Sequence, residues 1–125
     1  MNRKGSVSEM SLYSWDNVPE EQISEKLGRK LVWGKKIMLA RISLKKGCIV
    51  PSHRHEHEQA SFVLSGSLEF TLPREKVKVN QGQVLVVPSN VEHSALAVEP
   101  TVTLDIFSPI REDWLAGQDS YLRKK

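Results

Sequence analysis

The sequence predicts an all-β fold, either a barrel or a sandwich built from short strands. Two observations support this prediction. Extended segments rich in β-compatible residues follow one another at regular spacing between residues 37 and 107. Gly or Pro stands in each of the main breaks between them. The length of 125 residues suits one domain, and 39% hydrophobic with 26% charged residues is ordinary for a globular protein.

Strands are expected where apolar residues alternate with polar ones, or form short runs between turn residues. In chain order, these segments are Ile37 to Leu44, Ser61 to Leu64, Leu68 to Leu72, Val77 to Val79, Val84 to Val87 and Thr101 to Phe107.

Turn residues and faces add detail to these strands. Ser65-Gly66 predicts a hairpin, and the wholly apolar segment Val84 to Val87 is expected to be buried. In the last strand, one face carries Val102, Leu104 and Ile106, and the other carries Thr103, Asp105 and Phe107.

The C-terminal part contains the only helical signal. Ser108 is a possible N-cap, Pro109 suits a first helical position, and Gly117 suits a helix end. We therefore expect a short helix or turn carrying Trp114 and Leu115. Residues 1–10 are polar and are expected to be flexible, and residues 11–125 are expected to form a single domain.

Charge and composition argue against several classes of partner. The net charge is +3, but the basic residues are scattered in pairs rather than gathered on one face, so no nucleic-acid partner is expected. No stretch approaches transmembrane length and no signal peptide is visible, so no membrane association is expected. The single cysteine, Cys48, is expected to be a small buried residue, and one cysteine suits a reducing compartment, which favours a cytoplasmic location.

Three of the four histidines lie within five residues, in the string His53-Arg54-His55-Glu56-His57. Imidazole is the commonest protein metal ligand, and residues two apart on a strand point to the same side. His53 and His55 could therefore share an ion, and Gln59 could join them if the chain turns at residues 56–58. A histidine-rich surface loop would give the same string, and His57 fits the rim of a site better than its centre.

The spacing around these histidines resembles the two motifs of the cupin superfamily. Five residues separate Gly47 from the His53-x-His55 pair, three more precede Gln59, and six more precede Gly66. The second motif runs from Gly82 through Pro88-Ser89-Asn90 to His93. The resemblance implies a double-stranded β-helix barrel, also called a jelly roll. It also implies one divalent metal ion held by His53, His55, Gln59 and His93.

Two positions depart from the cupin pattern: Gln59 replaces the usual glutamate, and Asn90 replaces a glycine. A glutamine can ligate through its amide oxygen but brings no negative charge. A site of three neutral imidazoles and an amide would keep close to the full charge of the ion, favouring Lewis-acid chemistry and anionic substrates. The metal itself is left open among Ni, Zn, Mn and Fe.

A wider pattern resembles the pectin-degradation cupins of the KdgF type, which convert 4,5-unsaturated uronates to linear keto sugars. It includes the histidine string, Pro88 to Ala95, and Asp105 to Trp114. The resemblance implies catalytic roles for Asp105, Phe107 and Arg111, with a small anionic sugar acid as substrate and a homodimer as the assembly. Structural alternatives stay open: Asp105 could pair with a surface arginine, Phe107 could be plain core, and Arg111 could only bridge to a neighbouring acid.

Two other functions also stay open on the same barrel. One is an iron-dependent dioxygenase or another metal isomerase, because three histidines and a neutral ligand also suit iron. The other is a non-catalytic protein that binds a metal and a sugar acid. Oxygen consumption would favour the dioxygenase, and tight uronate binding without turnover would favour the binder.

Overall fold

The computed structural model describes residues 10–123, which form ten strands and three short helices. The flexibility expected for residues 1–10 stays a prediction. Residues 1–9 lie outside the described part of the chain, and Met10 is exposed. The elements in chain order are η1 (Trp15–Asn17), β1 (Glu21–Ser24), β2 (Leu27–Trp33), β3 (Met38–Leu44), β4 (Ile49–His53), β5 (Glu58–Ser65), β6 (Ser67–Thr71), β7 (Lys76–Asn80), β8 (Val84–Val87), β9 (His93–Ala97), β10 (Thr101–Ser108), α1 (Glu112–Leu115) and α2 (Ser120–Arg123).

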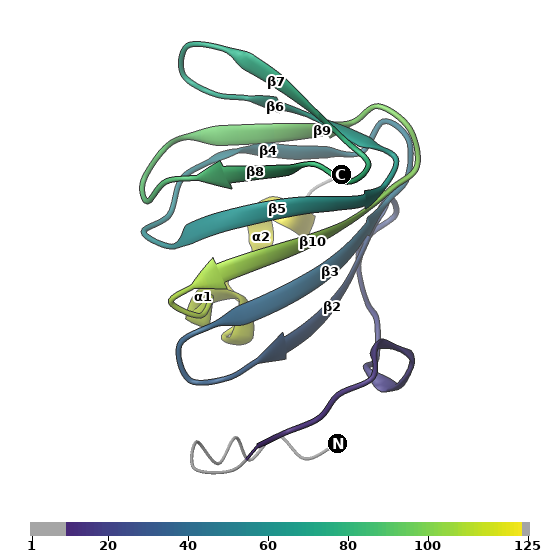
Figure 1. Cartoon of the computed structure of the whole chain (residues 1–125), viewed down its shortest axis with the longest axis vertical. Coiled ribbons are helices and arrows are strands. Elements are labelled where there is room, and N and C mark those ends of the chain that lie inside the picture. Colours follow the sequence, from purple (N-terminus) through teal and green to yellow (C-terminus); the bar gives the residue numbers. More distant parts are fainter. Residues whose placement is uncertain (1–9, 124–125) are drawn as a thin grey trace.

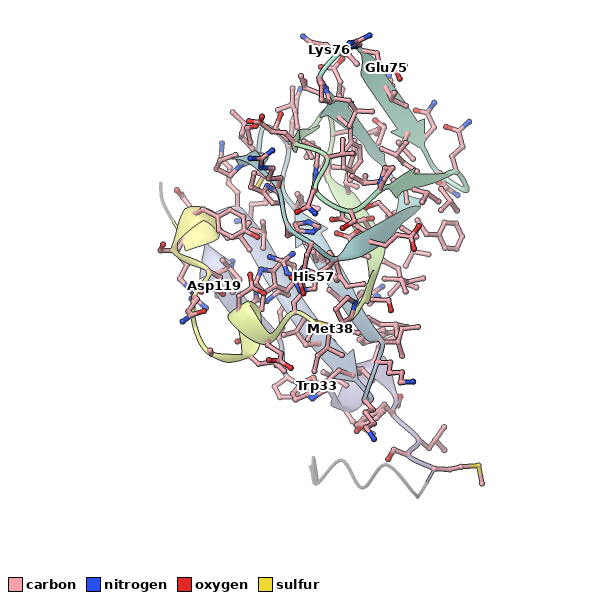
Figure 2. All side chains as sticks on the ribbon, turned by 90° about the vertical axis from the view of Figure 1, so that its left-hand side faces the viewer. Trp33, Met38, His57, Glu75, Lys76 and Asp119 are labelled. Carbon is pink, nitrogen blue, oxygen red and sulfur yellow. The ribbon has the colours of Figure 1, made fainter. Side chains whose placement is uncertain are left out.

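The strands form two antiparallel sheets that face each other as a jelly-roll barrel (Figure 1). Six strands make the first sheet, in the order β1-β2-β3-β10-β5-β8, and four make the second, in the order β4-β9-β6-β7. The expected all-β barrel is therefore confirmed. Figure 2 shows Glu75 and Lys76 at the tip of the β6–β7 hairpin, at the opposite end of the molecule from Trp33.

Alternation along the strands fills the space between the sheets. In β3 and β10 every second side chain is buried, which places Met38, Ala40, Thr103, Asp105 and Phe107 on inward-facing positions. The pleat of a strand sends the intervening residues to the other face. The face of Asp105 and Phe107 is thus the interior face of β10.

The C-terminal segment closes the barrel on one side. Helix α2 contacts β1 and β4, which are edge strands of the two different sheets. Its attachment depends on Asp119, which is completely buried and accepts hydrogen bonds from Arg29 (2.9 Å) and Arg123 (2.8 and 3.1 Å). A buried carboxylate shared by two guanidinium groups is a strong attachment.

Two expectations about local structure are wrong, one of them only in part. Ser65-Gly66 does not form a hairpin, because β5 and β6 belong to different sheets and the chain crosses between them there. Gly66 has a φ of +86°, and a Cβ atom on it would lie 2.3 Å from the Pro100 carbonyl oxygen, so a side chain does not fit. Strand β8 is buried only in part: it is an edge strand in which Val84 and Val86 are 55% and 56% exposed, whereas Val87 is 1% exposed.

The expected helix is present in the C-terminal part, but it begins later in the chain than Ser108 and Pro109 predict. Strand β10 continues through Ser108, because that residue still pairs with Glu58 of β5. Helix α1 begins only at Glu112, and Gly117 follows its end with a φ of +77°.

Candidate metal centre

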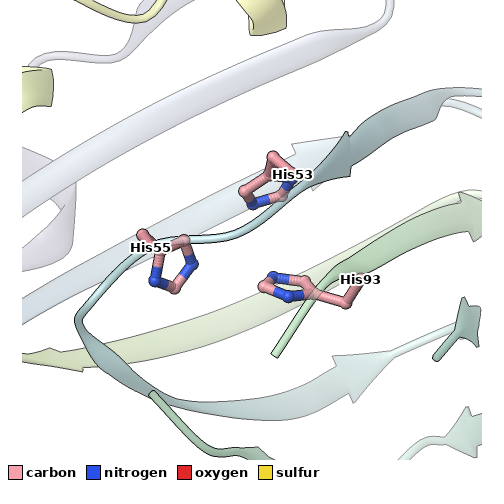
Figure 3. A group of neighbouring side chains, drawn as sticks. All are labelled: His53, His55 and His93. Carbon is pink, nitrogen blue, oxygen red and sulfur yellow. The ribbon is translucent and has the colours of Figure 1, made fainter. Parts of the chain in front are cut away.

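Three imidazoles converge from two strands and a connection (Figure 3). His53 ends β4 and His93 begins β9, and the two residues are cross-strand partners with ring centroids 4.4 Å apart. His55 lies in the connection to β5 rather than on the strand, so the expected strand geometry holds for His53 alone. The chain bends at residues 56 and 57, within the expected turn, and β5 begins at Glu58. One ring nitrogen from each histidine lies within 4.8 Å of those of the other two.

Backbone carbonyls fix the proton on the same ring nitrogen of each imidazole. The Nδ1 atoms of His53 and His93 lie 2.8 Å from the carbonyl oxygens of Pro51 and Val91, and that of His55 lies 3.1 Å from the carbonyl oxygen of His57. A carbonyl only accepts, so Nδ1 carries the hydrogen and Nε2 keeps its lone pair. In metal sites, a hydrogen bond of this kind from the ring nitrogen that does not bind the metal orients the histidine ligand.

Burial keeps these imidazoles neutral. It lowers the pKa of His53 and of His55 to about 4, and it also lowers the pKa of His93. The Nε2 atom of His93 is buried and has no hydrogen-bond partner among residues 10–123. A lone pair in that situation is ordinarily satisfied by a donor, a water or an ion. A divalent cation fits this site.

Gln59 lies where an oxygen ligand is expected. It is 5% exposed, its amide nitrogen donates to Ser61 Oγ (2.9 Å), and its Oε1 atom lies 3.2 Å from His55 Nε2. With Nδ1 of His55 protonated, both atoms of that last pair are acceptors, and two acceptors at this distance repel unless they share a cation. The donor set therefore fits one divalent ion, and ligation by these four residues stays a prediction.

Asp105 is a buried carboxyl group on the inner face of β10. Thr103 donates to its Oδ1 atom (3.1 Å), and Ser61 on the neighbouring strand also hydrogen-bonds to it. Burial raises the pKa of Asp105 from 3.8 to about 6, although these hydrogen bonds and Arg111 act in the opposite direction. A carboxyl with such a pKa can both accept and return a proton near neutral pH. Within residues 10–123, no arginine forms an ion pair with it.

Arg111 forms an ion pair with a neighbouring acid, which is the structural alternative that the sequence left open for it. Its Nε and Nη2 atoms donate to the carboxylate of Asp113 (3.0 and 2.7 Å), and its guanidinium lies over the rings of Phe107 (5.1 Å) and Trp114 (4.3 Å). Although burial disfavours the charge, the hydrogen bonds with Asp113 and Tyr121 and the nearby negative charge raise the pKa of Arg111 further. Its Nη1 atom is buried without a partner in the described chain.

One cavity brings these groups together. It is about 40 Å³, and its lining contains every predicted site residue except His55: His53, Gln59, His93, Asp105, Phe107 and Arg111. Apolar side chains from both sheets form the rest of the barrel wall. Phe107 is 1% exposed and contacts His55 edge-on, so it is both a core residue and a wall of the cavity.

The sequence missed the part of the wall supplied by the C-terminal segment. Trp114 lines the cavity and lies between the guanidinium groups of Arg29 and Arg111. Tyr121 lines the cavity too, and no motif or periodicity pointed to it. His57 is half-buried beside His55 and Phe107 and lies outside the histidine cluster, in agreement with a place at the rim.

Comparisons with known proteins agree with this architecture. The family model described as "Cupin domain" matches residues 40–107. KdgF from Halomonas sp. is 30% identical, with a TM-score of 0.78, over 83% of this chain and 99% of that one. An RmlC-like cupin from Shewanella frigidimarina is 26% identical, with a TM-score of 0.79, over 85% of this chain and 96% of that one.

An oxalate decarboxylase variant from B. subtilis shares the fold, with 21% identity and a TM-score of 0.73 over 83% of this chain and 33% of that one. No curated protein matches the chain. None of the helices between residues 10 and 123 is long and apolar enough to span a membrane. With the family model matching more than half of its length, the chain belongs to the cupin family.

Proposed function

We propose that the protein is a metal-dependent enzyme that converts 4,5-unsaturated uronate monosaccharides to linear 4-deoxy-5-keto uronates. The observation that carries this proposal is the meeting of a histidine cluster and a buried carboxyl group with a pKa of about 6 at one cavity. The resemblance to the pectin-degradation cupins supplies the substrate class, and the similarity to KdgF from Halomonas sp. supports it.

The reaction is an isomerisation that needs one proton moved between two substrate atoms. Asp105 would accept the proton of the anomeric hydroxyl through a carboxylate oxygen. The bond between the anomeric carbon and the ring oxygen then breaks, which leaves an aldehyde and an enolate. Asp105 would return the proton to C4, and the enolate becomes the ketone at C5. Thr103 and Ser61 hold the carboxylate in one orientation through their hydroxyl groups.

Charge on the substrate is balanced by two groups. Arg111 would use its unpaired Nη1 atom to hold the substrate carboxylate, while Asp113 keeps the guanidinium in place. A divalent ion bound by His53, His55, Gln59 and His93 would supply Lewis-acid stabilisation of negative charge on substrate oxygens. Phe107 and Trp114 make apolar walls that exclude water.

The test uses metal-loaded protein and a 4,5-unsaturated galacturonate. We expect loss of the ultraviolet absorbance of the conjugated double bond, with the linear keto acid as the product and no oxygen consumed. Chelator-treated protein and the Asp105→Asn variant should show little activity, and adding back metal should rescue only the former. Turnover with oxygen uptake would indicate a dioxygenase instead. Binding without turnover would indicate a sugar-acid binding protein.

We propose a homodimer as the assembly, formed through the outer face of the six-stranded sheet. Cross-strand pairing places apolar residues of four adjacent strands side by side on this face: Leu39, Ala60, Phe62, Val84, Val86, Leu104 and Ile106. A continuous apolar face of this kind is unusual on a monomer, and a second copy covers it with the same residues. Light scattering of wild type and of Phe62→Glu tests this, with a monomeric variant expected. The cytoplasmic location stays a prediction.

A further inference from the structure

The cavity is too small for the proposed substrate as it stands. Its volume of about 40 Å³ holds about three water molecules at ~10–15 Å³ each, which is far less than a hexuronate needs. A sugar acid can therefore enter it fully only if part of the wall moves. Ladder hydrogen bonds hold the barrel strands to their neighbours, whereas side-chain contacts hold α2 to the sheets. The C-terminal segment is thus the part of the wall that can move without breaking strand pairing, at the cost of its ion pairs through Asp119.

Tyr121 on α2 lies directly against the histidine cluster. Its ring centroid is 4.9 Å from that of His53, and its side chain lines the cavity. Two donors converge on its hydroxyl oxygen: Arg111 Nη2 and Trp114 Nε1, each at 3.1 Å. Figure 2 shows the C-terminal segment that carries Asp119, drawn in yellow at the left of the view.

The hydrogen of the Tyr121 hydroxyl is not used in a hydrogen bond within residues 10–123. A phenol oxygen accepts up to two hydrogen bonds and donates one. Arg111 and Trp114 occupy the accepting positions, and the Tyr121 hydroxyl donates no hydrogen bond to any other residue between 10 and 123. Donors that point at an oxygen strengthen the bond which that oxygen donates in turn. The Tyr121 hydroxyl that carries this hydrogen lies on the cavity wall, beside the predicted ion.

We propose that Tyr121 is a substrate-contacting residue, whose hydroxyl donates a hydrogen bond to an oxygen of the bound sugar acid when the C-terminal segment closes over it. The inference rests on the proposed function for the class of ligand. It adds a residue that none of the sequence motifs contains, and it assigns the closing segment a part in recognition. Arg111, which donates to Tyr121, would align the phenol with the same ligand carboxylate that it binds itself.

The test separates this contact from a structural role of α2. Tyr121→Phe keeps the ring against His53 and removes only the hydroxyl. Asp119→Asn keeps the hydroxyl and weakens the attachment of α2 to Arg29 and Arg123. For each metal-loaded protein, calorimetry gives the dissociation constant of saturated galacturonate, which cannot react. Metal content and the melting temperature are measured in parallel.

For Tyr121→Phe we expect galacturonate to bind about tenfold more weakly, the effect of one lost hydrogen bond to a charged group. Metal content should stay at the wild-type value. The melting temperature should fall by a few degrees, because Trp114 Nε1 loses its acceptor, but by less than in Asp119→Asn. Asp119→Asn should lower the melting temperature clearly. Tyr121→Phe binding within twofold of wild type would overturn the inference. So would a melting temperature as low as that of Asp119→Asn, because the hydroxyl would then only attach the helix.

This readout is independent of turnover. If wild type binds galacturonate but does not open unsaturated uronates, the ring-opening proposal fails, and weaker binding by Tyr121→Phe still supports the contact. If wild type turns the substrate over and Tyr121→Phe matches it in binding and in kcat/KM, the contact fails alone. No galacturonate binding by wild type overturns both.

Discussion

Replacing Asp105 by asparagine should make the metal-free protein more stable at neutral pH, although it should abolish activity. The side chain is 9% exposed, and burial raises its pKa from 3.8 to about 6. The folded protein therefore holds this proton more tightly than the unfolded chain does. Between pH 4 and pH 6 the folded state binds more protons, so the free energy of unfolding falls as the pH rises and levels off above about pH 6.

The size of the effect follows from the two pKa values. Their difference corresponds to about 3 kcal/mol of stability lost on ionisation, at ~1.4 kcal/mol per pH unit. Asparagine has nearly the same shape and carries no charge, so it removes this penalty. Weaker hydrogen bonds from Thr103 and Ser61 offset part of the gain, because neutral acceptors bind hydroxyl donors less strongly. We expect a net gain of about 1–3 kcal/mol at pH 7.5 and almost none at pH 4.

Urea unfolding of chelator-treated protein, followed by circular dichroism at several pH values, measures this directly. The histidines also titrate in this range, but they are present in both proteins and cancel in the difference. Glu75→Gln, an exposed carboxylate at a hairpin tip, is the control and should change stability by less than about 0.5 kcal/mol at every pH. The reasoning is wrong if Asp105→Asn is less stable than wild type at pH 7.5. It is also wrong if the difference is the same at pH 4 and pH 7.5.

Three further predictions address the ligands and the crossing between the sheets. His93→Ala should bind divalent metal at least tenfold more weakly in a competition titration with a chelator, and unchanged affinity would remove His93 from the site. Gln59→Glu should bind metal at least about tenfold more tightly in the same titration, because it adds a buried negative charge beside the ion; no change would place Gln59 away from it. Gly66→Ala should lose about 2 kcal/mol or more in urea unfolding, because it combines a φ of +86° with a Cβ clash. Gly82→Ala is the matched control, with a φ of +85° and open space, and an equal loss in both would show that the clash contributes nothing.

The sequence predicted well what depends on local pattern. Alternation along Thr101 to Phe107 separated the two faces of that strand correctly. The hairpin assigned to Ser65-Gly66 failed for a physical reason. A glycine with positive φ serves a tight turn within one sheet and a corner between two sheets equally well. Only the pairing of β6 with β7 and β9 distinguishes the two cases.

The candidate site was predictable where its residues share a strand or a motif, and not where they come from elsewhere. His53 and His93 stand forty residues apart but fall at the spacing of a known pair of motifs, and they meet as cross-strand partners. Tyr121 has no such spacing. It reaches the cavity because Asp119 is attached to Arg29, ninety residues away, and no local pattern encodes that contact. The exposed face of β8 was missed since an apolar run looks alike in a core and at an interface between subunits.

The polar groups that the folded chain leaves unpaired are informative as a set. Four buried side-chain atoms lack a partner within residues 10–123, and two of them, His93 Nε2 and Arg111 Nη1, belong to residues that line the cavity of Asp105. Each unpaired buried group lowers the stability of the ligand-free protein. A bound cation pairs the imidazole nitrogen, and a bound carboxylate pairs the guanidinium. Binding therefore restores stability at the same atoms that the chemistry uses, so metal and sugar acid together should raise the melting temperature more than either one alone.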